Sequence, residues 1–289
     1  MAGFTTVTFL SDYGTADEFV GVVKSVIREL APGALVLDLT HEVPPHDVRA
    51  GALTLARAMQ YVAPGVVLAV VDPGVGTDRR AVAVEVAEGA GVLVGPDNGL
   101  LAPAVAMAGG ASRAVELTDP EYHLAAPGPT FAGRDVFAPV AAHLCNGVPL
   151  ADLGPALDPG LLLPGIVPVS REEDGWVVAE VLWVDRFGNA QLNLGPEDVP
   201  GVADPQSRLS IRAGGGNRTV GVAGTYGAIR PGEVALVVDS YGLLSLAADR
   251  SSAAAELGLE VGTEVSIAPL EGDAPAGTRT SVHLGRSES

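Results

Sequence analysis

Residues 66–80 read VVLAVVDPGVGTDRR, an apolar run followed by an acid, a proline, two glycines and two arginines. The apolar run, 66–71, is typical of a parallel strand that is buried on both faces. It delivers Asp72 at its carboxyl end, where the proline and glycines turn the chain tightly. An acid and a guanidinium on one rigid turn can orient and polarise a small nucleophile. We therefore expect a sheet whose carboxyl edge carries a functional site at Asp72.

The alternation of strand and helix continues over the first half of the chain. Apolar residues at helical spacing predict helices between the strand-like runs, and Asp47 is expected to cap one of them. The expected strands are 6–10, 35–39, 66–71, 81–86, 91–94 and 114–117, and the expected helices are 17–30, 47–61, a segment opened by Asp97, and 135–144. This order predicts an α/β domain with a mostly parallel sheet and helices on both faces.

The pattern changes in the second half, where short strand-like segments are separated by Gly, Pro and Asp turns and only 251–257 looks helical. The expected strands are 176–184, 190–194, 209–212, 219–223, 234–238, 243–246 and 264–267. Such spacing predicts a small antiparallel all-β domain, a barrel or a sandwich. We expect an α/β domain over 1–152, a linker over 153–174, a barrel-like β domain over 175–270 and a mobile tail over 271–289.

The composition restricts the classes of partner. The chain has 289 residues, of which 47% are hydrophobic and 18% charged, as in a compact soluble protein. Its 17 basic and 35 acidic residues give a net charge of −18, which disfavours nucleic acid and anionic membranes. No apolar run is long enough for a membrane helix and the N-terminus lacks the pattern of a secretory signal, so we expect a cytoplasmic protein. The single cysteine, Cys145, excludes an intrachain disulfide, and no cluster has zinc-ligand spacing, so no metal is expected.

Two aspartates, Asp12 and Asp72, follow expected parallel strands. Ligands of open α/β sheets bind at the carboxyl edge of the strands, so two acids at this edge, each close to glycine, favour a pocket. Asp12 could hold a ribose diol with its two acceptor oxygens, or it could simply cap the following helix. The glycine-rich residues 74–77 lack the lysine of a P-loop, which disfavours a nucleoside triphosphate.

Several other motifs have ordinary structural explanations. Either Arg79 or Arg80 is expected to pair with a surface acid. The sequence PDNG at 96–99 is first of all a turn signal. In the second half, DRFGN at 185–189 is by itself a hairpin turn, and DSYG at 239–242 is equally ambiguous.

Six segments taken in order resemble one family, the S-adenosyl-L-methionine (SAM) hydroxide adenosyltransferases or adenosine-forming SAM hydrolases, which are related to the SAM-dependent fluorinase and chlorinase. The segments are SDYGT at 11–15, 71–80, PDNG at 96–99, TFAGRD at 130–135, DRFGN at 185–189 and DSYG at 239–242. Each segment is weak alone, but together they follow the order of the family. The resemblance implies an N-terminal α/β domain, a C-terminal barrel-like domain and a homotrimer. Each SAM would lie between the N-terminal domain of one subunit and the C-terminal domain of its neighbour.

The resemblance also assigns roles to residues of this chain. It implies that Asp12 binds the ribose hydroxyls and that Thr77 lies beside the C5′ carbon. The remaining implied contacts come from the second domain. They are Asp185 and Ser240 for the methionine end, and Phe187, Asn189 and the backbone near Arg250 for the adenine.

Position 72 distinguishes the branches of the family. The halogenases have a tyrosine there in an apolar halide pocket, whereas this chain has Asp72, with Arg79 seven residues later, like the hydrolases. A carboxylate in a dry pocket repels halide but accepts a hydrogen bond from water. Gly133 stands where the fluorinase has a serine, which also argues against fluoride.

The reaction implied by the resemblance is hydrolysis of SAM to adenosine and L-methionine. Water or hydroxide, positioned by Asp72 and Arg79, attacks C5′ opposite the sulfonium. Methionine leaves as a neutral thioether, so no acid, no metal and no cofactor beyond SAM as the substrate is implied. The protein contributes alignment and desolvation.

One residue departs from the family pattern. The hydrolases have a histidine in the motif TFHGRD, where this chain has Ala132, whose methyl group can neither take nor give a proton. Losing a general base costs roughly a hundred- to ten-thousand-fold in rate, so we expect slow hydrolysis. His46 is the better candidate substitute, because it stands where the fluorinase has a tryptophan near the ligand. His123 is expected on a surface loop and His143 on a helix.

Two alternatives remain at this stage. A protein that binds SAM or adenosine without turnover would form no adenosine. A SAM-dependent halogenase would form 5′-halo-5′-deoxyadenosine in amounts that rise with chloride, but Asp72 argues against it.

Overall fold

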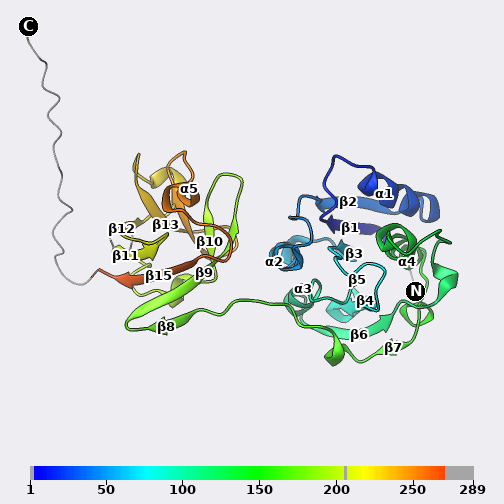
Figure 1. The fold of residues 1–289 in the computed structure, drawn as a ribbon. Coiled ribbons are helices and arrows are strands. Elements are labelled where there is room, and N and C mark those ends of the chain that lie inside the picture. The colour runs from blue at the N-terminus through cyan, green and yellow to red at the C-terminus, as the bar shows by residue number, and fades with distance from the viewer. Residues whose placement is uncertain (1–2, 205–206, 271–289) are drawn as a thin grey trace, which may run out of the picture. The chain divides into compact units, whose positions relative to one another are not determined.

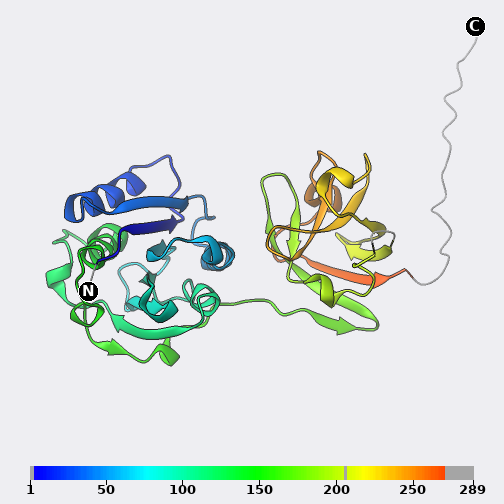
Figure 2. The ribbon, with the colours of Figure 1, turned by 180° about the vertical axis from the view of Figure 1, so that it is seen from behind.

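The computed structural model describes residues 3–204 and 207–270. The chain divides between Val167 and Pro168 into two compact units, here called the first and the second unit (Figures 1 and 2). The expected mobile tail, 271–289, lies outside the described residues. Among the described residues, no helix has both the length and the apolar composition that a membrane span requires.

The first unit is built on a seven-stranded sheet. Its strands are β1 (Thr6–Ser11), β2 (Leu35–Thr40), β3 (Gly65–Val70), β4 (Ala81–Val86), β5 (Gly91–Pro96), β6 (Ala111–Glu116) and β7 (Ala156–Leu157). Their order is β2-β1-β3-β5-β4-β6-β7. The pairs β1–β2, β1–β3 and β3–β5 are parallel. Strand β4 is antiparallel to both of its neighbours. The connection from β4 to β5 is too short for the crossover that a parallel pair would need. The predicted mostly parallel sheet is confirmed.

Helices cover both faces of this sheet, as predicted. They are α1 (Phe19–Leu30), α2 (Val48–Ala58), α3 (Ala102–Met107) and α4 (Ala138–Cys145). Helix α1 packs with α4 on one face, and α2 packs with α3 on the other (Figure 1). Asp47 caps α2 as predicted, because its Oδ1 accepts a hydrogen bond from the N–H of Ala50 at 2.8 Å. The expectation that Asp97 opens a helix is wrong, because α3 begins only at Ala102 and Asp97 is engaged elsewhere.

The central strand β3 explains the apolar run at 66–71. Its side chains alternate between two cores, so the strand is buried on both faces. Val66, Leu68 and Val70 enter the core beneath α1 and α4, and Val67, Ala69 and Val71 enter the core beneath α2 and α3. A polar side chain anywhere in this run would be buried in one of the two apolar cores, which explains why the run is entirely apolar.

The strand order creates a switch point beside β1. From β1 the chain passes through α1 to β2 on one side, and then returns through α2 to β3 on the other side of β1. The carboxyl ends of β1 and β3 thus border a crevice, which is the usual ligand position in open α/β sheets. Asp12 follows the end of β1 and Asp72 follows shortly after β3, so the topology brings the two acids to one edge.

The second unit is a closed barrel. Its elements are β8 (Arg171–Glu173), β9 (Trp176–Val184), β10 (Ala190–Leu192), β11 (Arg208–Ala213), β12 (Gly216–Val222), β13 (Val234–Val238), β14 (Leu244–Ala248), α5 (Ala253–Leu257) and β15 (Glu264–Pro269). The order β10-β14-β13-β12-β11-β15-β9 closes because β9 also pairs with β10, and β8 adds to β9 outside the ring. This confirms the barrel over the sandwich. Of these pairs, β12–β13 is parallel, against the antiparallel expectation.

A buried ion pair fastens the end of the first unit to its sheet. Arg80 donates from Nε to Asp97 at 2.9 Å, and the Asp97 side chain is only 3% exposed, so the expected surface acid is instead a buried one. Asp97 also accepts a hydrogen bond from the N–H of Leu163, and Arg80 donates to the carbonyl of Leu161. The segment 161–163 is therefore held to the sheet by both members of the pair.

We expect Asp97→Ala to lower the free energy of unfolding by about 3–5 kcal/mol, because it leaves Arg80 without its counter-charge and the N–H of Leu163 without its acceptor. Urea denaturation followed by circular dichroism measures the change. Glu29→Ala, at an exposed position of α1, is the control and should change stability by less than about 0.5 kcal/mol. Equal stability of the two variants would contradict the structural role of Asp97.

Candidate functional site

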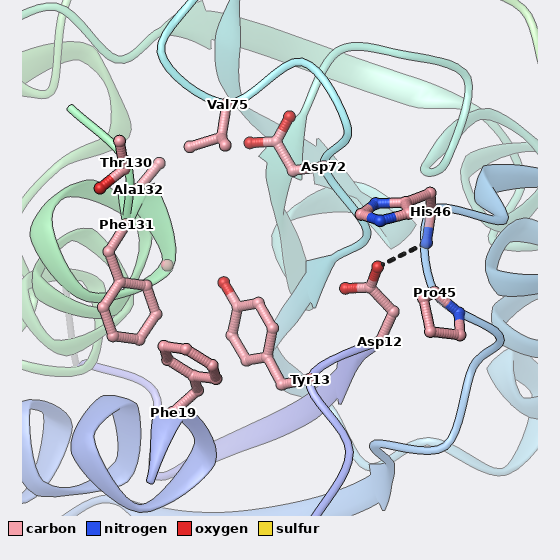
Figure 3. A pocket seen from close by; sticks show the side chains of 11 residues that line it. Asp12, Tyr13, Phe19, Pro45, His46, Asp72, Val75, Thr130, Phe131 and Ala132 are labelled. Carbon is pink, nitrogen blue, oxygen red and sulfur yellow. Dashed lines mark hydrogen bonds between the residues drawn. The ribbon is translucent and has the colours of Figure 1, made fainter. Parts of the chain in front are cut away.

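A pocket of about 260 Å³ lies at the switch point of the sheet (Figure 3). Four segments line it, namely residues 12–19 after β1, 45–46 before α2, 72–75 after β3, and 130–133 before α4. Five residues singled out in the sequence share this pocket. They are Asp12, His46, Asp72, Ala132 and Gly133. Sequence segments more than a hundred residues apart thus converge at one edge.

Asp72 presents a fixed carboxylate to the pocket. Arg79 donates from Nε to its two oxygens at 2.8 and 3.0 Å and from Nη2 to Oδ2 at 2.5 Å. The Asp72 side chain is 5% exposed and that of Arg79 is 14% exposed, and the guanidinium lies over the ring of Phe137. Because a bidentate pair restricts both partners, the carboxylate has one orientation. Arg79 itself borders a neighbouring cavity rather than this pocket.

Asp12 is available to a ligand. It does not cap α1, whose N-cap residue is Glu18. Its Oδ2 accepts a hydrogen bond from the backbone N–H of His46 at 2.9 Å, and its other oxygen points into the pocket (Figure 3). His46 adopts a left-handed backbone with φ 67°, and this conformation forms part of the turn that brings its N–H to Asp12.

A polar chain that runs from the buried Ser11 through the buried His41 to the exposed Asp38 holds the segment that carries Asp12. Ser11 Oγ lies 2.8 Å from Nδ1 of His41, and Nε2 of His41 lies 3.2 Å from Oδ1 of Asp38. Although burial raises the pKa of Asp38, hydrogen bonds from Lys24 and His41 hold it below its ordinary value. The carbonyl of His41 also accepts a hydrogen bond from the N–H of Gly14 at 2.8 Å. His41 therefore holds the 11–14 turn through both its ring and its backbone.

Tyr13, which the sequence reasoning did not single out, lies in the pocket. Its ring makes edge or tilted contacts with Phe9, Phe19 and Phe131 at centroid distances of 6.4, 5.8 and 5.7 Å. A Cβ added to Gly133 would lie 2.2 Å from the Tyr13 hydroxyl, so the tyrosine requires glycine there. Tyr13 belongs to the motif SDYGT at 11–15, but only the fold shows that its hydroxyl reaches the segment 132–133.

Ala132 lies between the pocket and a second cavity of about 530 Å³. The two candidate substitutes for the missing histidine fall on different sides, because His46 lines the pocket with Asp72, whereas His123 lines the second cavity with Arg79. His123 is partly buried rather than on the surface, and its Nε2 has no hydrogen-bond partner in the described part of the chain. Burial lowers the pKa of His123, against the charge of Asp119.

Two further sequence candidates lie elsewhere in the first unit. Thr77 is exposed and donates from its hydroxyl to the carbonyl of Gly74 at 2.6 Å, and Val75 of the same turn lines the pocket instead. Nothing in the sequence distinguishes these two positions, because the turn geometry decides which side chain points inward. His143 is on α4 as expected, with its ring against Tyr122 at 5.1 Å.

The second unit carries a separate cluster on the turn between β9 and β10. Oδ1 of Asp185 accepts hydrogen bonds from the N–H groups of Phe187 and Asn189, both at 2.9 Å, and its Oδ2 accepts one from the side-chain amide of Asn189 at 2.8 Å. Asp185 therefore builds this hairpin turn, and the Phe187 ring is 73% exposed at its tip. The N–H of Ala254 donates to the carbonyl of Gly188, so the segment after Arg250 lies against the same turn.

A second turn of the barrel, between β13 and β14, carries the exposed Ser240. Beside it, Asp239 accepts hydrogen bonds from Gln191 at 2.6 Å and from Ser245 at 3.0 Å. Burial and the nearby charges of Asp239 and Asp185 raise the pKa of Tyr226. No local sequence pattern marks Gln191 or Tyr226, since barrel closure and loop packing bring them to these turns. Among the described residues, no group of three or more His, Cys, Asp or Glu side chains could hold a metal ion.

Comparisons with known families match both units. The profile described as SAM hydroxide adenosyltransferase N-terminal domain matches residues 7–154, and the corresponding C-terminal domain matches residues 179–266. A protein of Salinispora tropica named (R)-S-adenosyl-L-methionine hydrolase is 45% identical over 92% of this chain and 99% of its own. One of the same name from Thermus thermophilus is 43% identical over 90% of this chain and 98% of its own.

The chain is also similar to more distant relatives and to solved structures. A fluorinase of Actinoplanes is 27% identical over 92% of this chain and 98% of its own. A crystal structure of a conserved protein from Thermotoga maritima has a TM-score of 0.84 and 34% identity over 91% of this chain and 99% of its own. A structure from Thermus thermophilus has a TM-score of 0.70 and 41% identity over the same shares.

We expect His41→Phe to loosen the 11–15 turn while the fold is retained, because phenylalanine keeps the ring packed on Phe9 but leaves the Ser11 hydroxyl without its partner on the histidine ring. Loss of the hydrogen-bond partner of a buried hydroxyl costs about 1–3 kcal/mol in the free energy of local opening. Amide exchange in the turn should therefore be about ten- to a hundred-fold faster. Hydrogen–deuterium exchange of the peptide that contains 11–15 measures this effect. His143→Phe on α4 is the control, and unchanged protection in His41→Phe would show that the ring of His41 does not hold the turn.

Proposed function

The chain belongs to the SAM hydroxide adenosyltransferase family, and we propose that the pocket at Asp72 is where it hydrolyses SAM to adenosine and L-methionine. Relatives that are 33–45% identical carry the name (R)-SAM hydrolase, so the chain is an enzyme of this activity. The observation that carries the choice of pocket is the Asp72–Arg79 pair, which presents a fixed carboxylate at the switch point.

The reaction is a displacement at C5′ in which water is the nucleophile. An oxygen–carbon bond forms as the bond from C5′ to sulfur breaks, and the electron pair stays on sulfur, which leaves as a neutral thioether. Asp72 accepts a hydrogen bond from the water and receives its proton before releasing it to solvent, while Arg79 holds the carboxylate in place. Orientation and exclusion of bulk water supply the rate acceleration.

The substrate contacts are assigned from the pocket in the first unit and from the family resemblance in the second unit. Asp12 keeps one oxygen free of the bond to His46, and we assign that oxygen to the ribose hydroxyls and place the sugar beside His46 and Gly133, which line the same pocket. On the barrel, we assign the methionine end and the adenine on the basis of the family resemblance. The assigned residues are Asp185 and Ser240 for the methionine end, and Phe187, Asn189 and the backbone near Arg250 for the adenine.

The assembly follows from the same resemblance. We propose a homotrimer that holds each SAM between the first domain of one subunit and the second domain of its neighbour, and that acts in the cytoplasm. SAM is the only small molecule the reaction requires, and we propose that neither a metal nor a further cofactor takes part.

Ala132 has no group that can transfer a proton, which favours a slow enzyme or, in the extreme, a protein that binds SAM without turnover. Incubation of the protein with SAM, followed by chromatography of the products, separates these cases. Adenosine that accumulates in proportion to the protein supports hydrolysis. Tight SAM binding without adenosine would favour the binding protein, and 5′-chloro-5′-deoxyadenosine that rises with chloride would favour a halogenase.

We expect Asp72→Asn to lower the rate of adenosine formation by about a hundred- to ten-thousand-fold, because the amide cannot take the proton from water. Asp78→Asn is the matched control, since Asp78 lies exposed on the same turn and should keep the full rate. The rate of adenosine formation at saturating SAM measures the effect. Indistinguishable rates for the two variants would remove Asp72 from the chemistry.

We expect Ala132→His to raise the rate, by up to about a hundred-fold, because it returns an imidazole to the wall between the two cavities. Ala132→Leu adds side-chain volume without a titrating group and should not raise the rate. Steady-state hydrolysis measured between pH 5 and 9 compares the three proteins. A gain in the leucine variant equal to that of the histidine variant would show that packing, and not proton transfer, limits the reaction.

A further inference from the structure

The hydroxyl of Tyr13 points into the space between Asp72 and the segment that carries Ala132 (Figure 3). Gly133 lies directly against this hydroxyl. Within the described residues, the oxygen makes no hydrogen bond. A polar group that faces a pocket with no protein partner is available to a water molecule or a ligand.

The position of this hydroxyl is fixed by packing. The rings of Phe19 and Phe131 contact the tyrosine ring from two sides and each other at 5.2 Å, which leaves the ring little freedom. The backbone N–H of Tyr13 also donates to Ser11 Oγ at 3.4 Å, so the polar chain of His41 supports the same residue. The hydroxyl is therefore preorganised, as a group that orients a reactant must be.

Burial, together with the carboxylates around it, favours the neutral phenol form of Tyr13. Burial is the main cause that raises its pKa, and the carboxylates of Asp12 and Asp72 raise it further, against a smaller opposite effect of Arg79. A neutral phenol donates and accepts hydrogen bonds but takes no proton from water. Tyr13 is thus not a replacement for the general base that Ala132 lacks.

We propose that Tyr13 is a catalytic residue that, with Asp72, holds the attacking water in line with C5′. This inference rests on the proposed hydrolysis. One hydrogen of the water is donated to the Asp72 carboxylate and the other to the Tyr13 oxygen, which leaves a lone pair directed at C5′. As the oxygen–carbon bond forms, Asp72 receives the proton and Tyr13 keeps its own. The small side chain of Ala132 leaves room for this water beside the Tyr13 hydroxyl, in the pocket that Asp72 also lines.

The product offers a probe of this water position that needs no turnover. The 5′-hydroxyl oxygen of adenosine is the former water oxygen, whereas 5′-deoxyadenosine lacks it. If Tyr13 binds that oxygen, the wild-type protein should prefer adenosine to 5′-deoxyadenosine by about tenfold. Tyr13→Phe, which removes only the hydroxyl and keeps the ring, should lower this preference, and the part that remains comes from Asp72, which binds the same oxygen.

The test combines this binding ratio, measured by calorimetry, with steady-state hydrolysis. For Tyr13→Phe we expect kcat to fall about ten- to a hundred-fold while KM for SAM changes less than about twofold, because Asp12 and the aromatic packing are retained. Tyr122→Phe, a tyrosine that packs on His143 away from the pocket, is the matched control and should match the wild type in both measurements.

The outcomes distinguish a failure of the role of Tyr13 from a failure of the proposed hydrolysis. A Tyr13→Phe variant that keeps the adenosine preference, or keeps the full kcat, overturns the role of Tyr13 even if the wild type hydrolyses SAM. Absence of adenosine from the wild-type reaction overturns the proposed hydrolysis, and with it the catalytic role of Tyr13, whatever the binding ratio. A fall in both preference and kcat in Tyr13→Phe alone supports the proposal.

Discussion

A carboxylate that is nearly removed from solvent must be paired, and the pairing of Asp72 with Arg79 is the constraint on which the site depends. The tight turn after β3 returns the chain so that Arg79 can form two parallel hydrogen bonds to the acid. Because β3 is packed on both faces, the turn starts from a rigid base. A loose strand or an unpaired acid would leave the nucleophile position undefined.

The turn at 11–14, which forms another wall of the pocket, is held by polar contacts and by aromatic packing. Ser11 and His41 are buried polar groups that connect to the exposed Asp38, and buried polar groups are stable only when they find partners. These polar contacts fix the turn that carries Asp12 and Tyr13. Aromatic packing then fixes the tyrosine ring, and the absence of a side chain at Gly133 leaves space for its hydroxyl. Small residues at 132 and 133 are therefore as much a part of the site as the charged ones.

On the barrel, structural and functional explanations of the same acids do not exclude one another. Asp185 satisfies the backbone of its own turn, as an ordinary turn aspartate does. The same hydrogen bonds hold the turn in one conformation and place Phe187 at its exposed tip. A turn motif that looked ambiguous in the sequence is thus compatible with a binding role.

The sequence by itself determined the α/β and barrel-like halves, the family and five of the eleven residues that line the pocket, because buried strands and turn motifs leave local patterns that can be recognised without any distant partner. Local patterns placed Asp12 and Asp72 on one edge, since the carboxyl ends of parallel strands share a side of the sheet. Only the tertiary structure decided that Val75 rather than Thr77 faces the pocket, that Arg80 pairs with the buried Asp97, and that the Tyr13 hydroxyl meets Gly133. These outcomes depend on side-chain directions and on contacts between segments far apart in the chain, which no local pattern encodes.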